Sequence, residues 1–198
     1  MFSGIIKSTG MITSIVASGT NRRMSIASPL TDTLSIDQSV AHDGVCLTVV
    51  AIMADHYIVE VVHETLTKTT FQFLQVGHII NLETSISLST LLDGHIVQGH
   101  VDTTLKCLDI KDLEGSWLMR FDLPAEYAQL VILHGSICLN GVSLTVAQLY
   151  DNTFEIAVIP YTFHNTNFQQ LRPGSFVNAE FDLIGKYILR QKTIADSK

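Results

Sequence analysis

One segment of this chain occurs twice. Residues 39–50 (SVAHDGVCLTVV) recur as residues 136–147 (SICLNGVSLTVA), and Gly44 pairs with Gly141 at an offset of 141 − 44 = 97. The alignment continues without a gap to Glu83 and Glu180. Because two copies of one sequence are expected to adopt one fold, the chain should contain two similar domains.

Each copy has the pattern of a small β-domain. Residues 58–62 and 154–158 are rich in β-branched residues, and residues 79–82 and 176–179 form further short apolar runs. Asp-Gly at residues 43–44 and Asn-Gly at residues 140–141 are strong signals for two-residue hairpin turns. Several short strands with turns between them predict an all-β antiparallel barrel or sandwich in each copy.

Two segments have helical character. Residues 124–133 can form one short helix, and a helix over residues 183–193 places Leu183, Ile184, Tyr187 and Ile188 on one face. This apolar stripe either joins subunits or packs on its own barrel. We therefore divide the chain into a first barrel (residues 1–95), a second barrel (96–184) and a C-terminal helix and tail (185–198).

The composition excludes several classes of protein. The net charge is −7 and Lys and Arg do not cluster, which argues against a nucleic-acid partner. Three cysteines without a C-x-x-C pair fit neither a disulfide framework nor a zinc site, so we expect reduced thiols and a cytoplasmic protein. No segment reaches the ~18 apolar residues of a membrane span. The mean hydropathy of +0.30 indicates either a buried subunit interface or ligand cleft, or two well-filled cores.

The two copies differ at a position that can carry chemistry. Cys46 stands where the second copy has Ser143, and both follow the hairpin turn. A thiol and a hydroxyl at equivalent positions of two pockets can each add to an electrophilic ligand or form a hydrogen bond with it. Cys46 can equally be a small buried apolar residue.

A second difference concerns an imidazole. When Gly99 is aligned with Gly4, His100 falls opposite Ile5. A histidine in only one copy suits the acid or base of an asymmetric reaction, although a structural histidine explains it equally well. His95 and His100 would lie on opposite faces of one strand, which does not suit a shared metal, so we expect no metal site.

A third difference is a carboxylate, because Asp182 stands opposite Ser85. A lone carboxylate near a chain end is usually solvated. Taken together, the three differences indicate a shared ligand-binding framework with unequal functional groups.

The chain resembles the riboflavin synthase family along its whole length. The resemblance rests on residues 1–6 (MFSGII), 44–49 (GVCLTV), 94–102 (GHIVQGHVD), 141–146 (GVSLTV) and 177–187 (VNAEFD…KY). It implies two six-stranded Greek-key barrels and a C-terminal helix that gathers a homotrimer. It also implies an active site between the N-terminal barrel of one subunit and the C-terminal barrel of its neighbour.

The resemblance implies a dismutation. Two molecules of 6,7-dimethyl-8-ribityllumazine would bind per site and exchange a four-carbon unit, which yields riboflavin and 5-amino-6-ribitylaminouracil. No cofactor would be needed, because the electron-poor pteridine is its own electron sink.

The family's reacting residues correspond to Cys46, His100 and Asp182, with Ser143 as the hydroxyl of the second barrel. His100 would remove a proton from the acidic 7-methyl group, and Cys46, Ser143 or a water would add to the other lumazine. Substrate contacts are expected from the residues that match the family's binding segments. The first pocket would use Gly4, Ile5, Ile6, Leu47, Thr48, Val62, His63, Glu64, Thr65, Gly99 and Val101, and the second would use Leu144, Thr145, Ile159, Pro160, Tyr161 and Thr162. Phe2 and His134 are further expected contacts.

The sequence departs from the family pattern in a few places. His134 stands where the family usually has Lys, Ser3 replaces Thr, Asp43 replaces Asn, and Asp93 replaces one Gly of the usual G-G-H. The alternative is a lumazine protein, which has this fold, binds one lumazine as an optical antenna and lacks the reactive residues. The presence of Cys46 and His100 favours the enzyme.

Overall fold

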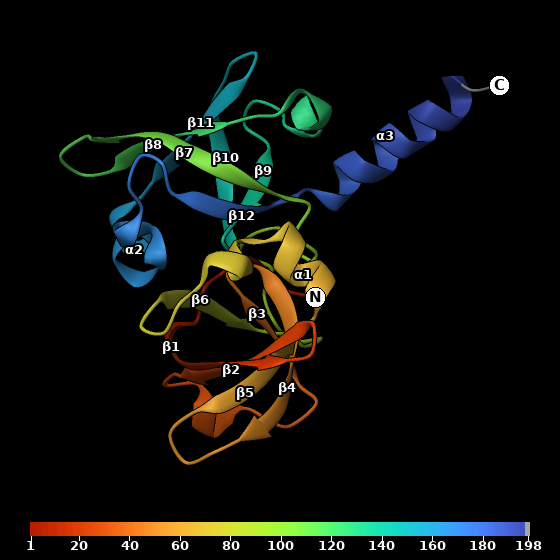
Figure 1. Cartoon of the computed structure of the whole chain (residues 1–198). Helices are drawn as coiled ribbons and strands as arrows, with labels where there is room; N and C mark the ends of the chain where they lie inside the picture. The colour runs from red at the N-terminus through yellow and green to blue at the C-terminus, as the bar shows by residue number, and fades with distance from the viewer. Residues whose placement is uncertain (197–198) are drawn as a thin grey trace.

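The computed structural model describes residues 1–196 and contains two closed antiparallel barrels of six strands each (Figure 1). The first barrel has the order β1-β2-β5-β4-β3-β6, and the second has the equivalent order β7-β8-β11-β10-β9-β12 around its ring. In both barrels the third strand pairs with the fourth and the sixth instead of the second, which is the crossed connection of a Greek key. The predicted fold class is confirmed.

The strands of the first barrel are β1 (Ser8–Ser18), β2 (Asn21–Ala27), β3 (Ser39–His42), β4 (Val45–Ile52), β5 (Tyr57–Val61) and β6 (Ile79–Thr84). Those of the second are β7 (Thr103–Asp112), β8 (Trp117–Asp122), β9 (Ser136–Leu139), β10 (Val142–Leu149), β11 (Thr153–Val158) and β12 (Phe176–Phe181). The helices are α1 (His63–Lys68), α2 (Pro160–Asn165) and α3 (Leu183–Asp196), with 3-10 turns η1 (Thr31–Thr33), η2 (Thr70–Phe73), η3 (Ala125–Leu130) and η4 (Asn167–Gln170).

The two predicted hairpin turns are confirmed, and they meet each other between the barrels. Asp43 and Asn140 have φ of 45°, and Gly44 and Gly141 have φ of 78° and 79°, as a type I′ turn requires. A Cβ on Gly44 would lie 2.8 Å from the backbone nitrogen of Gly141, and the reverse approach is equally close. Glycine therefore gives each turn its geometry and also allows the two turns to pack together.

A buried polar network surrounds these turns. The side-chain amide of Asn81 donates to the carbonyl of Asn140, and that of Asn178 donates to the carbonyl of Asp43, both at 2.9 Å. The Asn167 amide donates to Asp43 Oδ1 at 2.9 Å. The near-symmetry of these bonds follows from the duplication, because Asn81 and Asn178 are equivalent positions.

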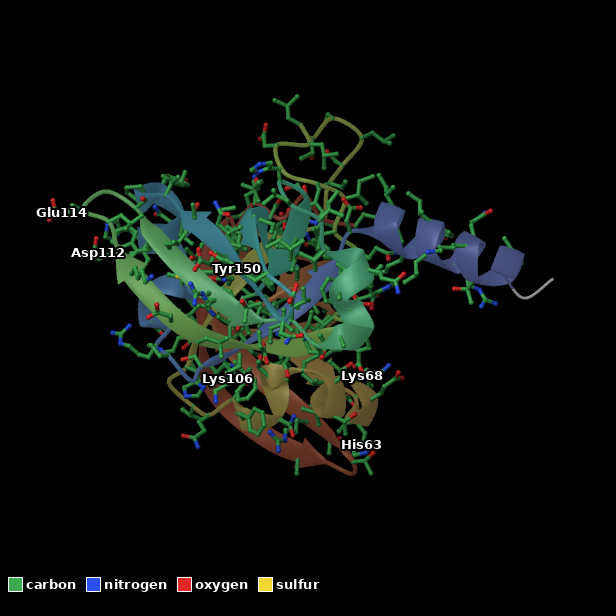
Figure 2. The ribbon with its side chains drawn as sticks, turned by 90° about the horizontal axis from the view of Figure 1, so that it is seen from above. His63, Lys68, Lys106, Asp112, Glu114 and Tyr150 are labelled. Carbon is green, nitrogen blue, oxygen red and sulfur yellow. The ribbon has the colours of Figure 1, made fainter. Side chains whose placement is uncertain are left out.

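The C-terminal helix is confirmed, and three of the four residues of its apolar stripe are exposed. Ile184, Tyr187 and Ile188 are 67%, 66% and 64% exposed. In Figure 1 the helix extends away from the second barrel, and in Figure 2 it projects to one side of the molecule. Its start is fixed by Asp182, whose Oδ1 accepts from the Ile184 N–H at 2.9 Å, and by the Lys186–Asp102 ion pair at 2.6 Å.

The predicted helix at residues 124–133 is a shorter 3-10 turn, η3. The segment between β6 and β7 covers residues 85–102, and our proposed domain boundary after residue 95 falls within it. No helix within residues 1–196 is both long and apolar enough to cross a membrane.

One buried polar pair of the first barrel has apolar counterparts in the second barrel. In the first barrel His42 Nε2 lies 2.8 Å from the hydroxyl of Tyr57, and both side chains are fully buried. The second barrel has Leu139 and Phe154 at the equivalent positions. Burial lowers the pKa of His42 to about 4, although a hydrogen bond to the Val40 carbonyl opposes the shift.

We expect the double variant His42→Leu/Tyr57→Phe, which copies the second barrel, to gain stability relative to the parent as pH falls from about 6.5 to about 4. In this window the unfolded histidine binds a proton and the buried folded ring does not, so the parent loses free energy of unfolding. Across the whole window, the free energy of unfolding of the variant should rise relative to that of the parent by on the order of 3 kcal/mol. Urea unfolding followed by circular dichroism across the window measures it.

Asp43→Asn, which copies Asn140, is the matched control, and we expect its stability relative to the parent to change with pH in the opposite direction. Burial raises the pKa of Asp43 to about 7 from 3.8, so the folded parent binds a proton that the unfolded chain lacks between these values. The parent therefore gains stability from Asp43 as pH falls, and this variant should lose stability relative to it. A pH-independent difference between the His42→Leu/Tyr57→Phe variant and the parent would contradict the assignment.

Candidate functional site

Each barrel carries one pocket that is completed by the leader of the other repeat. The leaders are the extended segments 2–6 and 97–101, which precede β1 and β7. The first pocket, of about 240 Å³, is lined by Val45, Cys46, Glu64, Thr65, Lys68, Thr69, Gly99, His100 and Val101. The second, of about 200 Å³, is lined by Gly4, Ile5, Ile6, Val142, Ser143, Ile159, Tyr161, Thr162, Asn165 and Thr166.

The two leaders pair with each other, and each then pairs with the barrel of the other repeat. We call this arrangement the crossing of the leaders. Phe2 and Val97 exchange two backbone hydrogen bonds, of 2.7 and 3.0 Å. The Cys46 N–H donates to the Gly99 carbonyl at 2.9 Å, and the Ser143 N–H donates to the Gly4 carbonyl at 2.8 Å. Because Cys46 corresponds to Ser143 and Gly99 to Gly4 in the repeat, the two contacts are copies of one arrangement.

Close approach at these contacts requires glycine. A Cβ on Gly99 would lie 2.5 Å from the Cβ of Cys46, and a Cβ on Gly4 would lie 2.5 Å from the Cβ of Ser143. Both glycines also have positive φ, 83° and 76°. The leader can therefore rest directly on the residue that carries the thiol or hydroxyl.

Two buried carboxylates hold the leaders in place. Glu180 accepts backbone N–H bonds from Gln98, Gly99 and His100 at 2.7–2.9 Å. Glu83 accepts from the backbones of Ser3 and Gly4 and from the Ser3 hydroxyl. Burial raises the pKa of both carboxyl groups, and the hydrogen bonds that they accept oppose the shift.

The role of these glutamates was not predicted from the sequence. Glu83 and Glu180 were recognised only as matching positions of the repeat. A signal was present, because each is a charged residue at the same place in two matching strands that carry several apolar residues.

The first pocket brings together two of the predicted reacting residues. Cys46 lies on β4 and His100 on the second leader, and α1 forms the rim, on which Lys68 and Glu64 form an ion pair of 2.8 Å. Figure 2 shows His63 and Lys68 at the two ends of α1. A thiol and an imidazole around one cavity provide a nucleophile and a proton acceptor for a bound ligand.

The second pocket contains Ser143, whose hydroxyl has an unexpected partner. Ser143 Oγ lies 2.7 Å from His95 Nδ1. Burial lowers the pKa of His95, and the negative charge of Asp182 partly opposes this. The contact between His95 and Ser143 has no signal in the sequence, because it depends on the crossing of the leaders.

Asp182 and His134 line a third cavity, apart from Cys46 and His100. This cavity, of about 470 Å³, lies between α3 and the second barrel, and it is lined by Gln129, Leu130, Ile132, His134, Gly135, Ser136, Asp182, Ile184, Gly185, Ile188, Leu189 and Lys192. Within one chain the four predicted reacting residues are therefore spread over three cavities.

Comparison with known proteins assigns the family. The lumazine binding domain model matches twice, at residues 3–85 and 98–182. Riboflavin synthase of Bacillus amyloliquefaciens is 36% identical over 191 residues, which cover 96% of this chain and 89% of the relative. Riboflavin synthase of Mycobacterium tuberculosis is 36% identical over 195 residues, which cover 96% and 97%. The chain belongs to the riboflavin synthase family.

Solved structures of LumP have a similar fold. A crystal structure of LumP complexed with riboflavin has a TM-score of 0.86 and 26% identity over 91% of this chain and 99% of that chain. LumP complexed with 6,7-dimethyl-8-(1'-D-ribityl) lumazine has a TM-score of 0.83 at 24% identity.

The structure places the other residues expected from the riboflavin synthase family in four settings. Several line the two pockets: Gly4, Ile5, Ile6, Glu64, Thr65, Gly99, Val101, Ile159, Tyr161 and Thr162. Gly4–Ile6 belong to the second pocket, not to the first. Phe2, Leu47 and Leu144 are buried in apolar clusters. Thr48, Val62, Thr145 and Pro160 are exposed, and His63 lines a separate surface cavity.

Residues that the riboflavin synthase resemblance did not suggest also line the pockets. Lys68 and Thr69 line the first, and Asn165 and Thr166 line the second. Thr69 and Thr166 are equivalent positions of the repeat. Within residues 1–196 no three His, Cys, Asp or Glu side chains are grouped so that they can hold a metal ion.

Proposed function

We propose that the chain catalyses the riboflavin synthase reaction, in which one 6,7-dimethyl-8-ribityllumazine transfers a four-carbon unit to another. The main observation that supports this proposed reaction is the presence of two related but unequal pockets in one chain. Two similar pockets suit two identical ligands, and unequal functional groups can make one ligand the donor and the other the acceptor. Bringing the two ligands together also supplies proximity, which is worth several kcal/mol of barrier.

We propose a separate role for each reacting side chain. His100 accepts a proton from the acidic 7-methyl group of one lumazine. Cys46, Ser143 or a water that they position adds to the electrophilic ring of the other lumazine. The pteridine takes up the electrons, so the proposed reaction uses no cofactor.

The complete site is proposed to form between subunits of a homotrimer, from the first barrel of one subunit and the second barrel of its neighbour. Two features support this. The apolar stripe of α3 is exposed in the single chain, and Asp182 lies in a different cavity from His100. A cytoplasmic location is also proposed, and the free cysteines Cys46, Cys107 and Cys138 fit it.

Incubation with the lumazine tests the function. We expect riboflavin to form, with its characteristic absorbance, and the rate to be unchanged by a chelator. Tight fluorescent binding without riboflavin would favour the alternative, a lumazine protein. Absence of both binding and turnover would contradict both.

We expect Ile188→Asp to convert the trimer to monomers, because it places a charge in the apolar stripe that is proposed to be buried between subunits. Sedimentation velocity measures the change. Thr193→Asp is the control, since residue 193 lies about 140° around the helix from residue 188 at ~100° per residue. An Ile188→Asp protein that still sediments as a trimer would show that the stripe is not the interface.

A further inference from the structure

His95, the hydrogen-bond partner of Ser143, has no role in the proposed mechanism. Ser143 Oγ and His95 Nδ1 are 2.7 Å apart, which is a short hydrogen bond. Ser143 lines the second pocket, so its hydroxyl can contact a ligand there. His95 comes from the segment between the barrels and is half-buried.

The backbone is fixed on the C-terminal side of His95. Two residues later, Val97 is buried and exchanges two backbone hydrogen bonds with Phe2 of the first leader. The same leader accepts the Ser143 N–H at the Gly4 carbonyl. One leader therefore fixes both the segment that carries His95 and the strand that carries Ser143.

The surroundings of His95 favour a neutral imidazole ring, which can accept a proton. Burial lowers the pKa of His95, so at neutral pH one ring nitrogen is free to accept the Ser143 O–H. The Asp182 carboxylate acts on the ring in the opposite direction, and it would stabilise the imidazolium once a proton had been transferred. No hydrogen bond joins the side chains of Asp182 and His95, and Asp182 Oδ1 accepts from the Ile184 N–H.

Within residues 1–196, the first pocket has no copy of this pair. In the part of the chain that the structure describes, no side-chain hydrogen bond involves the thiol of Cys46, the counterpart of Ser143. A nucleophile in contact with a base is therefore a feature of the second pocket.

We propose that His95 is a positioning residue that acts through Ser143, accepting the hydroxyl proton as Ser143 Oγ adds to the ring of the lumazine in the second pocket. The Oγ–carbon bond forms while the electron pair of the ring C=N bond moves to nitrogen, and the proton passes from Oγ to Nδ1. Reversal of the step restores both residues. This inference rests on the proposed function and selects Ser143 among the possible nucleophiles.

His95→Asn provides the sharpest test by mutation. Its amide can replace the hydrogen bond near the position of Nδ1 but cannot take up the proton. We expect lumazine binding within about threefold of the parent, and turnover lower by about 10²-fold, within the range of acid–base groups. His56→Asn, at an imidazole paired with Asp55 outside the pockets, should have no effect.

A double-mutant cycle separates the proposed role from general damage. Because the two residues act as one unit, Ser143→Ala with His95→Asn should be no slower than the slower single variant. Multiplication of the two losses would overturn the proposal. Parental turnover in His95→Asn would also overturn it.

Imidazole ¹⁵N NMR of the ligand-free protein provides a readout that does not depend on turnover. We expect His95 with its proton on Nε2 and a bare Nδ1, and a changed Nδ1 resonance in Ser143→Ala. A proton on Nδ1 would make His95 a donor to Ser143 and overturn the proposal. A parent protein that forms no riboflavin would instead contradict the proposed function, and NMR would still decide whether His95 accepts the Ser143 proton.

Discussion

Replacing Gly99 by alanine should lower riboflavin formation by at least about 10²-fold. The new Cβ would lie 2.5 Å from the Cβ of Cys46, so either the leader or β4 must move. His100 follows directly in the chain and would move with the leader. A displacement of about 1 Å at a reacting group can cost 10²-fold in rate. The rate of riboflavin formation at saturating lumazine measures the loss.

Gly77→Ala is the matched control for this variant. Gly77 also has positive φ, 93°, but a Cβ there would have no atom within 4 Å. It imposes the backbone strain of a non-glycine residue, roughly 1–2 kcal/mol, without the collision. If both variants lose activity equally, strain and not the contact with Cys46 explains the result.

The second large effect is expected from His100→Gln. We expect lumazine affinity within about tenfold of the parent, equivalent to roughly 1.4 kcal/mol, and turnover lower by ~10²–10⁴. The reason is that glutamine preserves much of the polar surface of the pocket but cannot act as a base. Fluorescence titration and riboflavin formation measure binding and turnover separately.

Two outcomes would change the assignment of His100. Intact turnover would make it a structural residue, and an equal loss of binding and turnover would make it a ligand contact. His56→Gln is a suitable control, because that ring pairs with Asp55 and lines neither pocket.

The features that could be predicted from the sequence are those with a local signal. The Asp43-Gly44 and Asn140-Gly141 turns, the short strands and the C-terminal helix each depend on a few neighbouring residues. The duplication then predicted two barrels instead of one, because two copies of one sequence are expected to adopt the same fold.

The crossing of the leaders had no local signal. Gly4 and Gly99 were recognised as equivalent, but an offset does not say which barrel a leader contacts. For this reason Gly4 was expected near the first pocket and is found at Ser143, and His95 was not expected near any hydroxyl. The proposed roles of Cys46, His100, Asp182 and Ser143 remain predictions.

The crossed leaders also bear on how the protein is made. During synthesis the Gly4 carbonyl emerges first, but its partner, the Ser143 N–H, is added 143 − 4 = 139 residues later. The pocket of the first barrel likewise lacks one wall until residues 99–101 have left the ribosome. The first barrel can therefore close its strands early, but its pocket is complete only after the leader of the second repeat has been translated, and the second pocket uses a leader made at the start of the chain.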